Sequence, residues 1–521
     1  MPLSRRAMLA ALSSLPAVAP VIACAAPGKP RVVAVDLTRA KGPVDRFFDL
    51  SVGSDYPGTL MRADSQAQLK TAVDELGFRY IRFHAIFHDV LGTVKIKDGK
   101  IVYDWTKIDQ LYDTLLAKGL KPFVELGFTP VALKTSGNAI FYWQGNTSHP
   151  KLEPWRDLVD AFVRHIRQRY GEGEVRTWFF EVWNEPNLKG FWEGADKAAY
   201  FELYDVTAKA IKAIDPTLRV GGPSTAGGAW VPEFLAHVKA SGAPVDFVTT
   251  HTYGVDGGFV DEAGKEDTKL SASPDAVLGD IRRVRREISA SPFPDLPLYF
   301  TEWSTSYSPR DPVHDSYVSA PYILEKLRRA QGLLQGMSYW TYSDLFEEGG
   351  PPTAPFQGGF GLMNPQGIRK PAWFAYKYLA VVKGQAIACE DDRVFAARDG
   401  DRVAVLAYDW RTPQQTVSNR PFYGKLHPST DIEPLKLRLA GLKPGSYRLR
   451  VRRTGYRKND AYSAYIDMGS PTSLTADQLR QLEGLTIDTP EIDTVVKTTG
   501  ETVVDLPMRS NDIVLVELTP A

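Results

Sequence analysis

Between residues 46 and 380 the chain alternates short apolar runs with longer amphipathic stretches, and this alternation limits the possible folds more than any other feature. Strands that alternate with helices predict parallel strands joined by crossovers, and eight such units predict an α/β fold, a closed (β/α)8 TIM barrel. An open, doubly wound sheet is the alternative, but no GxGxxG motif follows a strand and opens a helix. The eight runs with the length of strands span residues 48–52, 80–83, 122–126, 179–183, 219–221, 247–250, 298–301 and 337–341.

The stretches between these runs have the spacing of amphipathic helices. An arginine cluster at residues 282–286 has two interpretations, a nucleic-acid patch or the solvated face of one such helix. Apolar residues recur at helical spacing through the cluster, which favours the helix. Lysine plus arginine and aspartate plus glutamate both number 62, so no net charge recruits nucleic acid or anionic lipid. The other helices with clear spacing span residues 66–76, 105–118, 155–170, 198–214 and 320–335.

Beyond residue 380 the pattern changes to short strands separated by turn residues, which is typical of an all-β module. Asp399 and Gly400 form a hairpin turn, and residues 31–37 form a lone strand that we expect to join the same module. The segment 456–499 is predicted to be a long loop with one helix at 475–485, close to the barrel mouth. The candidate strands of the module span residues 393–397, 403–408, 435–439, 446–452, 501–506 and 512–518.

The N-terminus has the pattern of an export signal at residues 1–25. Two arginines precede an apolar run at 7–23 that is too short and too rich in small residues for a membrane span. The pattern is similar to a twin-arginine signal, so we expect export from a bacterial cytoplasm to the periplasm. The segment Ala23-Cys24-Ala25 fits a cleavage site, and a lipobox with Cys24 as the lipidated residue is the alternative. Either outcome leaves Cys389 as the only cysteine able to form a bond within the mature chain.

Two glutamates lie at the carboxyl ends of predicted strands, each beside a tryptophan. Glu185 lies within Trp183-Asn184-Glu185-Pro186-Asn187, where the proline ends the strand, and Glu302 lies within Thr301-Glu302-Trp303. The carboxyl ends of barrel strands meet at one face, so we expect both acids there. Glycoside hydrolysis requires two carboxyl groups that flank one bond, one protonated to donate to the leaving oxygen and one ionised. We therefore predict a catalytic barrel at 46–380 and an accessory β-sandwich at 31–40 plus 381–521.

Longer motifs on the other strands carry a resemblance to a known family. The pair WNEP and TEW resembles clan A of the retaining glycoside hydrolases. The longer phrases resemble glycoside hydrolase family 39, the β-xylosidase and α-L-iduronidase family, over roughly residues 46–380. These phrases are Arg82-Phe83-His84, Val124-Glu125-Leu126-Gly127-Phe128, EVWNEPNL at 181–188, His251-Thr252-Tyr253, and YWTYSDLFEE at 339–348.

The resemblance implies a role for each matching residue. Glu185 would be the acid/base and Glu302 the nucleophile of a double displacement, with the two carboxyl groups about 5–5.5 Å apart. Asn184 would hydrogen-bond the 2-hydroxyl of the sugar, and Tyr253 would donate its hydroxyl to Glu302. The remaining positions would line the pocket. His251 and Arg82 would lie beside the nucleophile, and Phe128 and Trp340 would be apolar platforms for the sugar ring. The hydroxyls of the sugar would be bound by His84, Glu347 and Glu348.

The charges near strand eight favour one substrate class within the family. An iduronidase must bind a carboxylate, which requires cationic donors, whereas Asp344, Glu347 and Glu348 suit hydroxyls and would repel a uronate. This favours a neutral pentose, and we predict an exo-acting β-xylosidase that cleaves xylo-oligosaccharides or aryl and alkyl pentosides. An α-L-arabinosidase or another glycosidase of family 39 is the second candidate. A carbohydrate-binding barrel without turnover is the alternative of another class, although a binder needs no second carboxylate opposite the first.

No cofactor and no metal is expected. His84 and His88 lie four residues apart, but no HExxH motif and no third ligand follows them. The sequence leaves the oligomeric state open, a homo-oligomer included.

Overall fold

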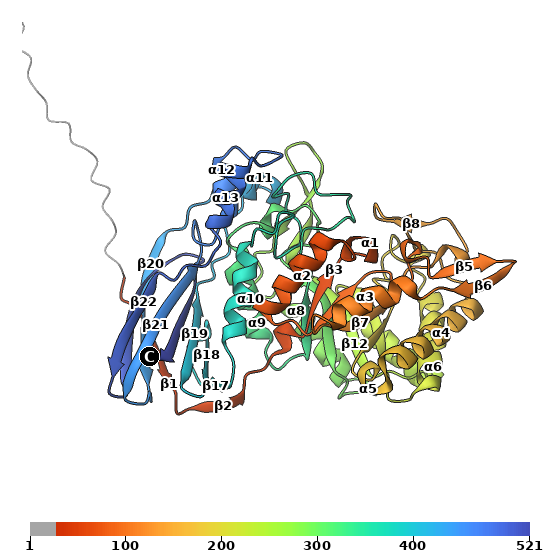
Figure 1. Cartoon of the computed structure of the whole chain (residues 1–521), viewed down its shortest axis with the longest axis horizontal. Coiled ribbons are helices and arrows are strands. Elements are labelled where there is room, and N and C mark those ends of the chain that lie inside the picture. The colour runs from red at the N-terminus through yellow and green to blue at the C-terminus, as the bar shows by residue number, and fades with distance from the viewer. Residues whose placement is uncertain (1–27) are drawn as a thin grey trace, which may run out of the picture.

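The structure is a computed structural model that describes residues 28–521. The predicted export signal at 1–25, with Cys24, lies outside the described residues. Figure 1 shows a barrel surrounded by helices beside a body of β-sheets, with α9 (Ser319–Ala330) and α10 (Pro371–Val381) between them. In the part of the chain that the structure describes, no helix is long and apolar enough to cross a membrane.

Eight parallel strands close into a barrel in chain order, so the predicted (β/α)8 fold is confirmed. The first strand begins at Ser51 rather than at residue 48, because Phe47–Asp49 forms a 3-10 turn. Three strands run three to five residues further than predicted, since polar residues continue the ladder toward the barrel mouth after the apolar run has ended. The barrel strands are β3 (Ser51–Ser54), β4 (Tyr80–Phe83), β7 (Lys121–Leu126), β10 (Phe179–Val182), β11 (Arg219–Ala226), β12 (Phe247–Tyr253), β15 (Leu298–Ser304) and β16 (Gly336–Tyr339).

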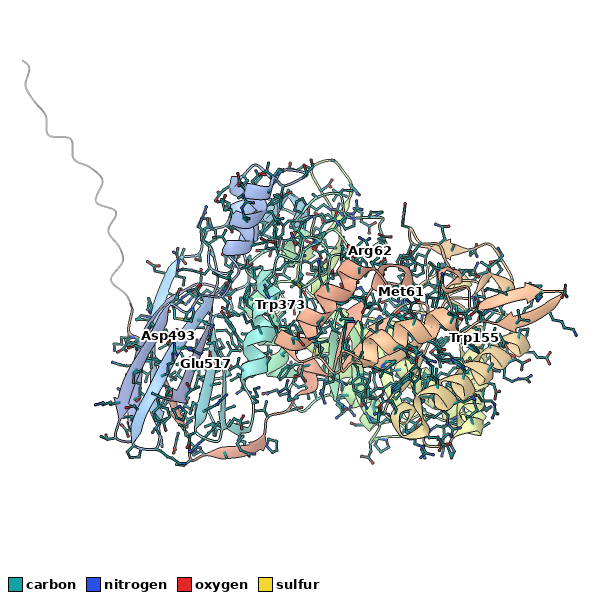
Figure 2. All side chains as sticks on the ribbon, in the orientation of Figure 1. Met61, Arg62, Trp155, Trp373, Asp493 and Glu517 are labelled. Atoms are coloured by element: carbon teal, nitrogen blue, oxygen red, sulfur yellow. The ribbon has the colours of Figure 1, made fainter. Side chains whose placement is uncertain are left out.

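Helices cover the outside of the barrel with their apolar sides. In α8 (Leu278–Ser289) the apolar side is buried and the arginines of the cluster are partly exposed, as predicted. The sequence missed α10, which is apolar around most of its circumference because it packs against both the barrel and the sheets. Trp155 of α4 and Trp373 of α10 are fully buried (Figure 2). The other large helices are α2 (Ala63–Leu76), α3 (Thr106–Leu116), α4 (Leu152–Tyr170), α6 (Lys197–Ile214) and α7 (Val231–Ser241).

Short helices and hairpins lie in the loops of the barrel. Most lie near the carboxyl ends of the strands, where loops shape the mouth of a barrel. They are α1 (Pro57–Leu60), α5 (Glu172–Val175), and the hairpins β5 (Val94–Lys97) with β6 (Lys100–Tyr103), β8 (Ala139–Ile140) with β9 (Gly145–Asn146), and β13 (Val255–Val260) with β14 (Glu266–Leu270).

The barrel interior changes from aromatic to charged along the strands. Phe123 and Phe179 are register partners and stack at 4.6 Å in an aromatic cluster with Phe247 and Tyr299. Alternate residues of a strand point to the same face, so the acids two positions later also point inward. Those acids are Glu125 and Glu181, and they form the floor of the site described below.

The second body is a β-sandwich of a seven-stranded and a three-stranded sheet. The lone strand β1 (Arg31–Asp36) pairs in parallel with β20 (Asp431–Ala440). Along β18 (Val394–Asp399), alternate side chains pack on the other sheet and on the barrel helices, so both faces of the larger sheet are buried. The remaining strands are β2 (Ala40–Pro43), β17 (Gln385–Ile387), β19 (Arg402–Tyr408), β21 (Gly445–Thr454), β22 (Ile492–Thr498), β23 (Glu501–Arg509) and β24 (Ile513–Pro520), with the short helix α11 (Asn419–Tyr423) between β19 and β20.

The segment 456–499 is more ordered than the predicted loop. It contains the expected helix α13 (Ala476–Gly484), a further helix α12 (Ala461–Asp467), and β22 at the sheet edge. A mostly exposed edge strand has a weak apolar signature, which explains why the sequence missed it. Residues of α12 and α13 pack on Phe356 and Ile368, so this segment contacts the long loop after β16.

Candidate active site

A cavity of about 750 Å³ opens at the carboxyl ends of the barrel strands. Seven of the predicted site residues line it: His84, Asn184, Glu185, Tyr253, Glu302, Trp340 and, from the loop after β16, Glu348. Residues far apart in the sequence meet here because the barrel gathers the ends of all its strands at one face.

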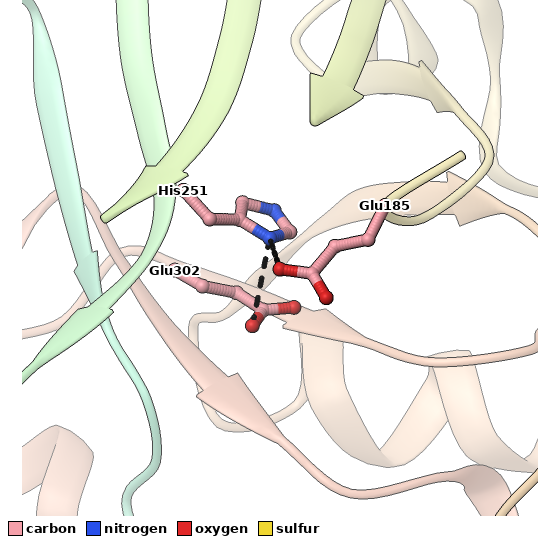
Figure 3. Close-up of side chains that lie close together, drawn as sticks. All are labelled: Glu185, His251 and Glu302. Atoms are coloured by element: carbon pink, nitrogen blue, oxygen red, sulfur yellow. Dashed lines mark hydrogen bonds and ion pairs between the residues drawn. The ribbon is translucent and has the colours of Figure 1, made fainter. Parts of the chain in front are cut away.

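Glu185 and Glu302 face each other across this cavity, with His251 between them (Figure 3). Nδ1 of His251 lies 2.9 Å from Oε1 of Glu185 and 3.6 Å from Oε2 of Glu302. An oxygen of each carboxyl group lies within 4.8 Å of the other. Retaining glycosidases have carboxyl groups about 5–5.5 Å apart, and inverting enzymes about 6.5–9.5 Å. The separation here fits direct attack by one carboxylate, without a water between the two.

Glu185 lies in a sharp turn that directs it into the cavity. Its backbone has a φ of 46°, that of Trp183 has a φ of 70°, and its N–H donates to the carbonyl of Ser224 at 2.8 Å. Burial raises the pKa of Glu185 to about 7, although the charges of His84 and Arg82 act in the opposite direction. Burial also lowers the pKa of His251 to about 4, so a neutral imidazole adjoins Glu185. These surroundings favour a protonated Glu185.

Glu302 has surroundings of the opposite kind. Arg82 donates to Oε1 at 2.7 Å, and the hydroxyl of Tyr253 donates to Oε2 at 2.7 Å. Two donors, one of them a cation, bind the ionised form of a carboxyl group more strongly than the protonated form. The same residue type therefore has an environment for an acid at one side of the cavity and for an anion at the other.

A buried charge network lies beneath the pair and fixes Arg82. Its guanidinium contacts Glu181 at 2.5 Å, Glu125 at 3.1 Å and the Oδ1 of Asn184 at 2.8 Å. Burial alone would lower the pKa of Arg82. The carboxylates of Glu181, Glu125 and Glu302 raise it by more than burial lowers it, so the side chain stays cationic. The sequence reasoning did not assign Glu125 and Glu181 to the site. The sequence pattern that could have identified them is an acid within an apolar strand. A buried acid requires a cationic partner, so such an acid indicates a charged site.

The wall near β4 and β16 presents polar groups beside an indole ring. His84 contacts Glu125 through Nδ1 at 2.7 Å and Glu348 through Nε2 at 3.2 Å. Burial raises the pKa of Glu348 to about 8. The Nδ2 of Asn184 is buried and has no hydrogen-bond partner among the described residues, so it is available to a bound hydroxyl. Trp340 packs 4.7 Å from His84, and a side chain at Gly53 would collide with its ring.

Several predicted residues lie outside the cavity lining. Phe128 is buried, with its ring 5.3 Å from that of Trp143 and 5.9 Å from that of Trp183, and its backbone has a positive φ of 57°. Glu347 points to Arg62 at 3.2 Å. Phe141 and Phe191 supply aromatic lining instead. Arg82 and His251 are fully buried behind the carboxyl groups, and His251 lies nearer to Glu185 than to the expected Glu302.

The spacing of Glu185, His251 and Glu302 is also that of a metal-binding cluster. A divalent cation there would share the carboxylate of Glu302 with the guanidinium of Arg82, which contacts it at 2.7 Å, and two cations on one buried carboxylate repel each other. The donor set therefore suits proton transfer better than metal binding.

Comparisons with known proteins identify the family of this chain. The model of glycosyl hydrolases family 39 matches residues 31–503. A β-xylosidase of Caldicellulosiruptor saccharolyticus is 37% identical over 458 residues, which cover 86% of this chain and 90% of the relative. A β-xylosidase of Geobacillus stearothermophilus is 42% identical over 366 residues, covering 68% and 72%. The crystal structure of a monomeric β-xylosidase from Caulobacter crescentus CB15 is 79% identical, with a TM-score of 0.93 and coverage of 94% and 99%.

Proposed function

Because this chain belongs to the glycosyl hydrolases family 39, we propose that it is a retaining β-xylosidase, which releases xylose from the non-reducing ends of xylo-oligosaccharides. The observation that carries this proposal is the contrast between Glu185 and Glu302, which lie close together in one cavity but in opposite electrostatic surroundings. Such a contrast is what a double displacement requires of its two carboxyl groups.

In the first step Glu302 attacks the anomeric carbon of the bound xylose. The bond to the leaving oxygen breaks, and Glu185 transfers its proton to that oxygen, so the leaving group departs as a neutral alcohol. The product is a xylosyl ester of Glu302. Arg82 and Tyr253 hold the attacking carboxylate in place through its two oxygens.

In the second step Glu185, now ionised, takes a proton from water, and the water oxygen attacks the anomeric carbon. The ester bond to Glu302 breaks, xylose leaves with retained configuration, and both carboxyl groups return to their starting states. His251 stays neutral throughout and orients Glu185 through the contact at 2.9 Å.

The wall near β4 and β16 binds the xylose itself. The free Nδ2 of Asn184 donates to the 2-hydroxyl, an interaction that strengthens in the transition state. Glu348 and His84 bind hydroxyls further from the reacting centre, and Trp340 covers the apolar face of the ring. Of the three acids on which the sequence argument for a neutral sugar depended, Glu348 alone lines the cavity, because Asp344 is paired with Lys370.

Kinetics with p-nitrophenyl β-xyloside test the proposal. Glu302→Ala should lose at least about a thousandfold in kcat, because the attacking group is gone. The matched control is Glu347→Gln, because Glu347 does not line the cavity and is paired with Arg62; this variant should retain activity. Absence of turnover by the wild-type protein on aryl pentosides, including α-L-arabinosides, contradicts the proposal.

Azide rescue separates the two roles. Glu302→Gly with azide should give the inverted α-xylosyl azide, since azide replaces the missing nucleophile on the opposite face. Glu185 replaced by glycine should give the β-xylosyl azide, because azide then attacks the glycosyl ester. The reverse pairing of products would exchange the assigned roles.

For location, we propose export through the twin-arginine-like signal, in support of xylan degradation outside the cytoplasm. Replacing Arg5 and Arg6 by lysine should retain the protein in the cytoplasmic fraction. If the signal is simply cleaved, Cys24→Ser should leave the amount of exported, membrane-free protein unchanged. If Cys24 is lipidated, the same substitution should abolish attachment to the membrane.

A further inference from the structure

The cavity extends well beyond the residues that bind the reacting sugar. In the barrel order, His84 follows β4, and Trp340 follows β16, so both lie on one half of the mouth. The opposite half is formed by the ends of β11 and β12, where Ala226 and Thr252 line the cavity. Glu185, after β10, and Glu302, on β15, lie between the two halves.

The order of the strands around the barrel indicates where the leaving group lies. If xylose occupies the half near β4 and β16, as the proposed function requires, the bond to be cleaved lies between the carboxyl groups. The leaving group must then extend into the half formed by β11 and β12. That half is lined mainly by small or apolar groups, among them Leu188, Val255 and Tyr307.

Asp280 supplies the carboxyl group of this half, since the other carboxyl groups that line the cavity are the reacting pair and Glu348 near the sugar. It comes from the first turn of α8. Its Oδ2 accepts a hydrogen bond from the hydroxyl of Thr252 at 2.7 Å, and its Oδ1 accepts one from Arg283 at 2.9 Å. The side chain is thus fixed in orientation and is 33% exposed.

The fixed carboxylate retains capacity for further hydrogen bonds. An ionised carboxyl group offers about four acceptor positions, of which Thr252 and Arg283 occupy two. Arg283 also donates to the carbonyls of Gly227 and Gly228, so the loop after β11 that lines the same half is held together with Asp280. An oriented, partly exposed acceptor among apolar neighbours is suited to hydroxyl groups.

We propose that Asp280 is a specificity-determining residue that accepts hydrogen bonds from the hydroxyls of a sugar leaving group. The inference rests on the proposed function, and it adds that the enzyme distinguishes polyhydroxylated leaving groups from plain aryl or alkyl groups. A site built to bond a hydroxyl discriminates strongly against analogues that lack it.

A purely structural role for Asp280 makes a different prediction. An acid in the first turn of a helix also stabilises the helix through its dipole, and its loss would affect every substrate alike. Both xylobiose and p-nitrophenyl β-xyloside form the same xylosyl ester on Glu302, so they share the second step. A leaving-group contact must therefore change kcat/KM for xylobiose and not for the aryl glycoside.

The test compares both substrates with Asp280→Asn and Asp280→Ala. We expect kcat/KM on xylobiose to fall about tenfold to a hundredfold, and kcat/KM on p-nitrophenyl β-xyloside to change by less than about threefold. Asp280→Asn preserves the shape of the side chain and should show the smaller loss. Asp275→Asn is the matched control, because Asp275 precedes the same helix, is 58% exposed and pairs with Arg282 outside the cavity.

Transfer to an added sugar gives a second readout. With p-nitrophenyl β-xyloside as donor and xylose as acceptor, the variants should form less transfer product per hydrolysis, since the acceptor occupies the leaving-group position. Equal losses on both substrates, or an unchanged xylobiose rate, would overturn the inference. Failure of the wild-type protein to cleave the aryl xyloside would instead contradict the proposed function.

Discussion

Glu185 and Glu302 show how two identical residues acquire different chemistry from their neighbours. Glu185 adjoins a neutral imidazole in a buried turn, whereas Glu302 accepts hydrogen bonds from a guanidinium and a phenol. Burial raises the pKa of Glu185 to about 7, which keeps its proton available at neutral pH. The difference arises from position within the barrel and not from the residues themselves.

The pH dependence follows from this pKa. Glu185 is protonated below about pH 7, and in the proposed mechanism it donates this proton in the first step, so kcat/KM should fall about tenfold per unit as pH rises above that value. In Glu185→Gln the fall above pH 7 should disappear for 2,4-dinitrophenyl β-xyloside, whose leaving group needs no proton. The measurement is a pH profile of kcat/KM for both proteins. A fall that persists in the variant would assign the alkaline limb to another group.

Among the elements, the loop between β16 and α10 carries more of the site than any strand. It bears Glu348 and Phe360, and it is fixed at its end by Lys370, which is fully buried. The ammonium group lies 2.6 Å from Asp344 and 2.6 Å from Asp315 of the neighbouring loop, and donates to the carbonyl of Gly359 at 2.9 Å. One buried cation thus connects the loops that follow β15 and β16.

Removal of this cation should be costly. Lys370→Met leaves two buried carboxylates unpaired and should lower the free energy of unfolding by about 3–5 kcal/mol, with a raised KM for aryl xylosides. Urea denaturation measures the first effect and steady-state kinetics the second. Lys70→Met, which breaks an exposed pair with Asp74, should cost less than about 1 kcal/mol. Equal stability of the two variants would show that the buried pair contributes nothing.

At the scale of the whole molecule, the barrel and the sandwich share one apolar core. Side chains of β19 and β24, among them Leu406 and Leu515, pack in the same cluster as the barrel helices, and the hydroxyl of Tyr408 donates to Glu325 of α9 at 3.0 Å. The N-terminal strand β1 also pairs with β20. We propose that the barrel at 46–380 and the sandwich at 31–40 plus 381–521 form one folding unit.

Calorimetry tests this proposal. The protein should unfold in a single transition, with thermal loss of activity at the same midpoint, because separation of the two parts exposes the shared apolar surface. A protein truncated after residue 381 should fail to fold, since the sheet that covers α9 and α10 is absent. Two resolved transitions, or an active truncated barrel, would show that the parts fold independently.

The sequence determined the barrel, the sandwich and the pair at the strand ends. Local patterns suffice for these, because apolar runs of strand length, helical spacing and turn residues report on neighbours along the chain. The same patterns placed Glu185 and Glu302 at the mouth, since strand ends converge at one face of a barrel. They missed α10, because it is buried on both sides and lacks an amphipathic pattern. They also missed β22, because it is a mostly exposed edge strand.

Only the tertiary structure decided how the side chains are used. Glu347 and Glu348 are adjacent in sequence, yet one contacts Arg62 outside the cavity and the other contacts His84 within it. The contacts of Arg82 with Glu181 and of Asp280 with Thr252 join residues on different elements. The pKa of a carboxyl group and the direction of a ring depend on neighbours brought from distant parts of the chain, and no local pattern in the sequence records them.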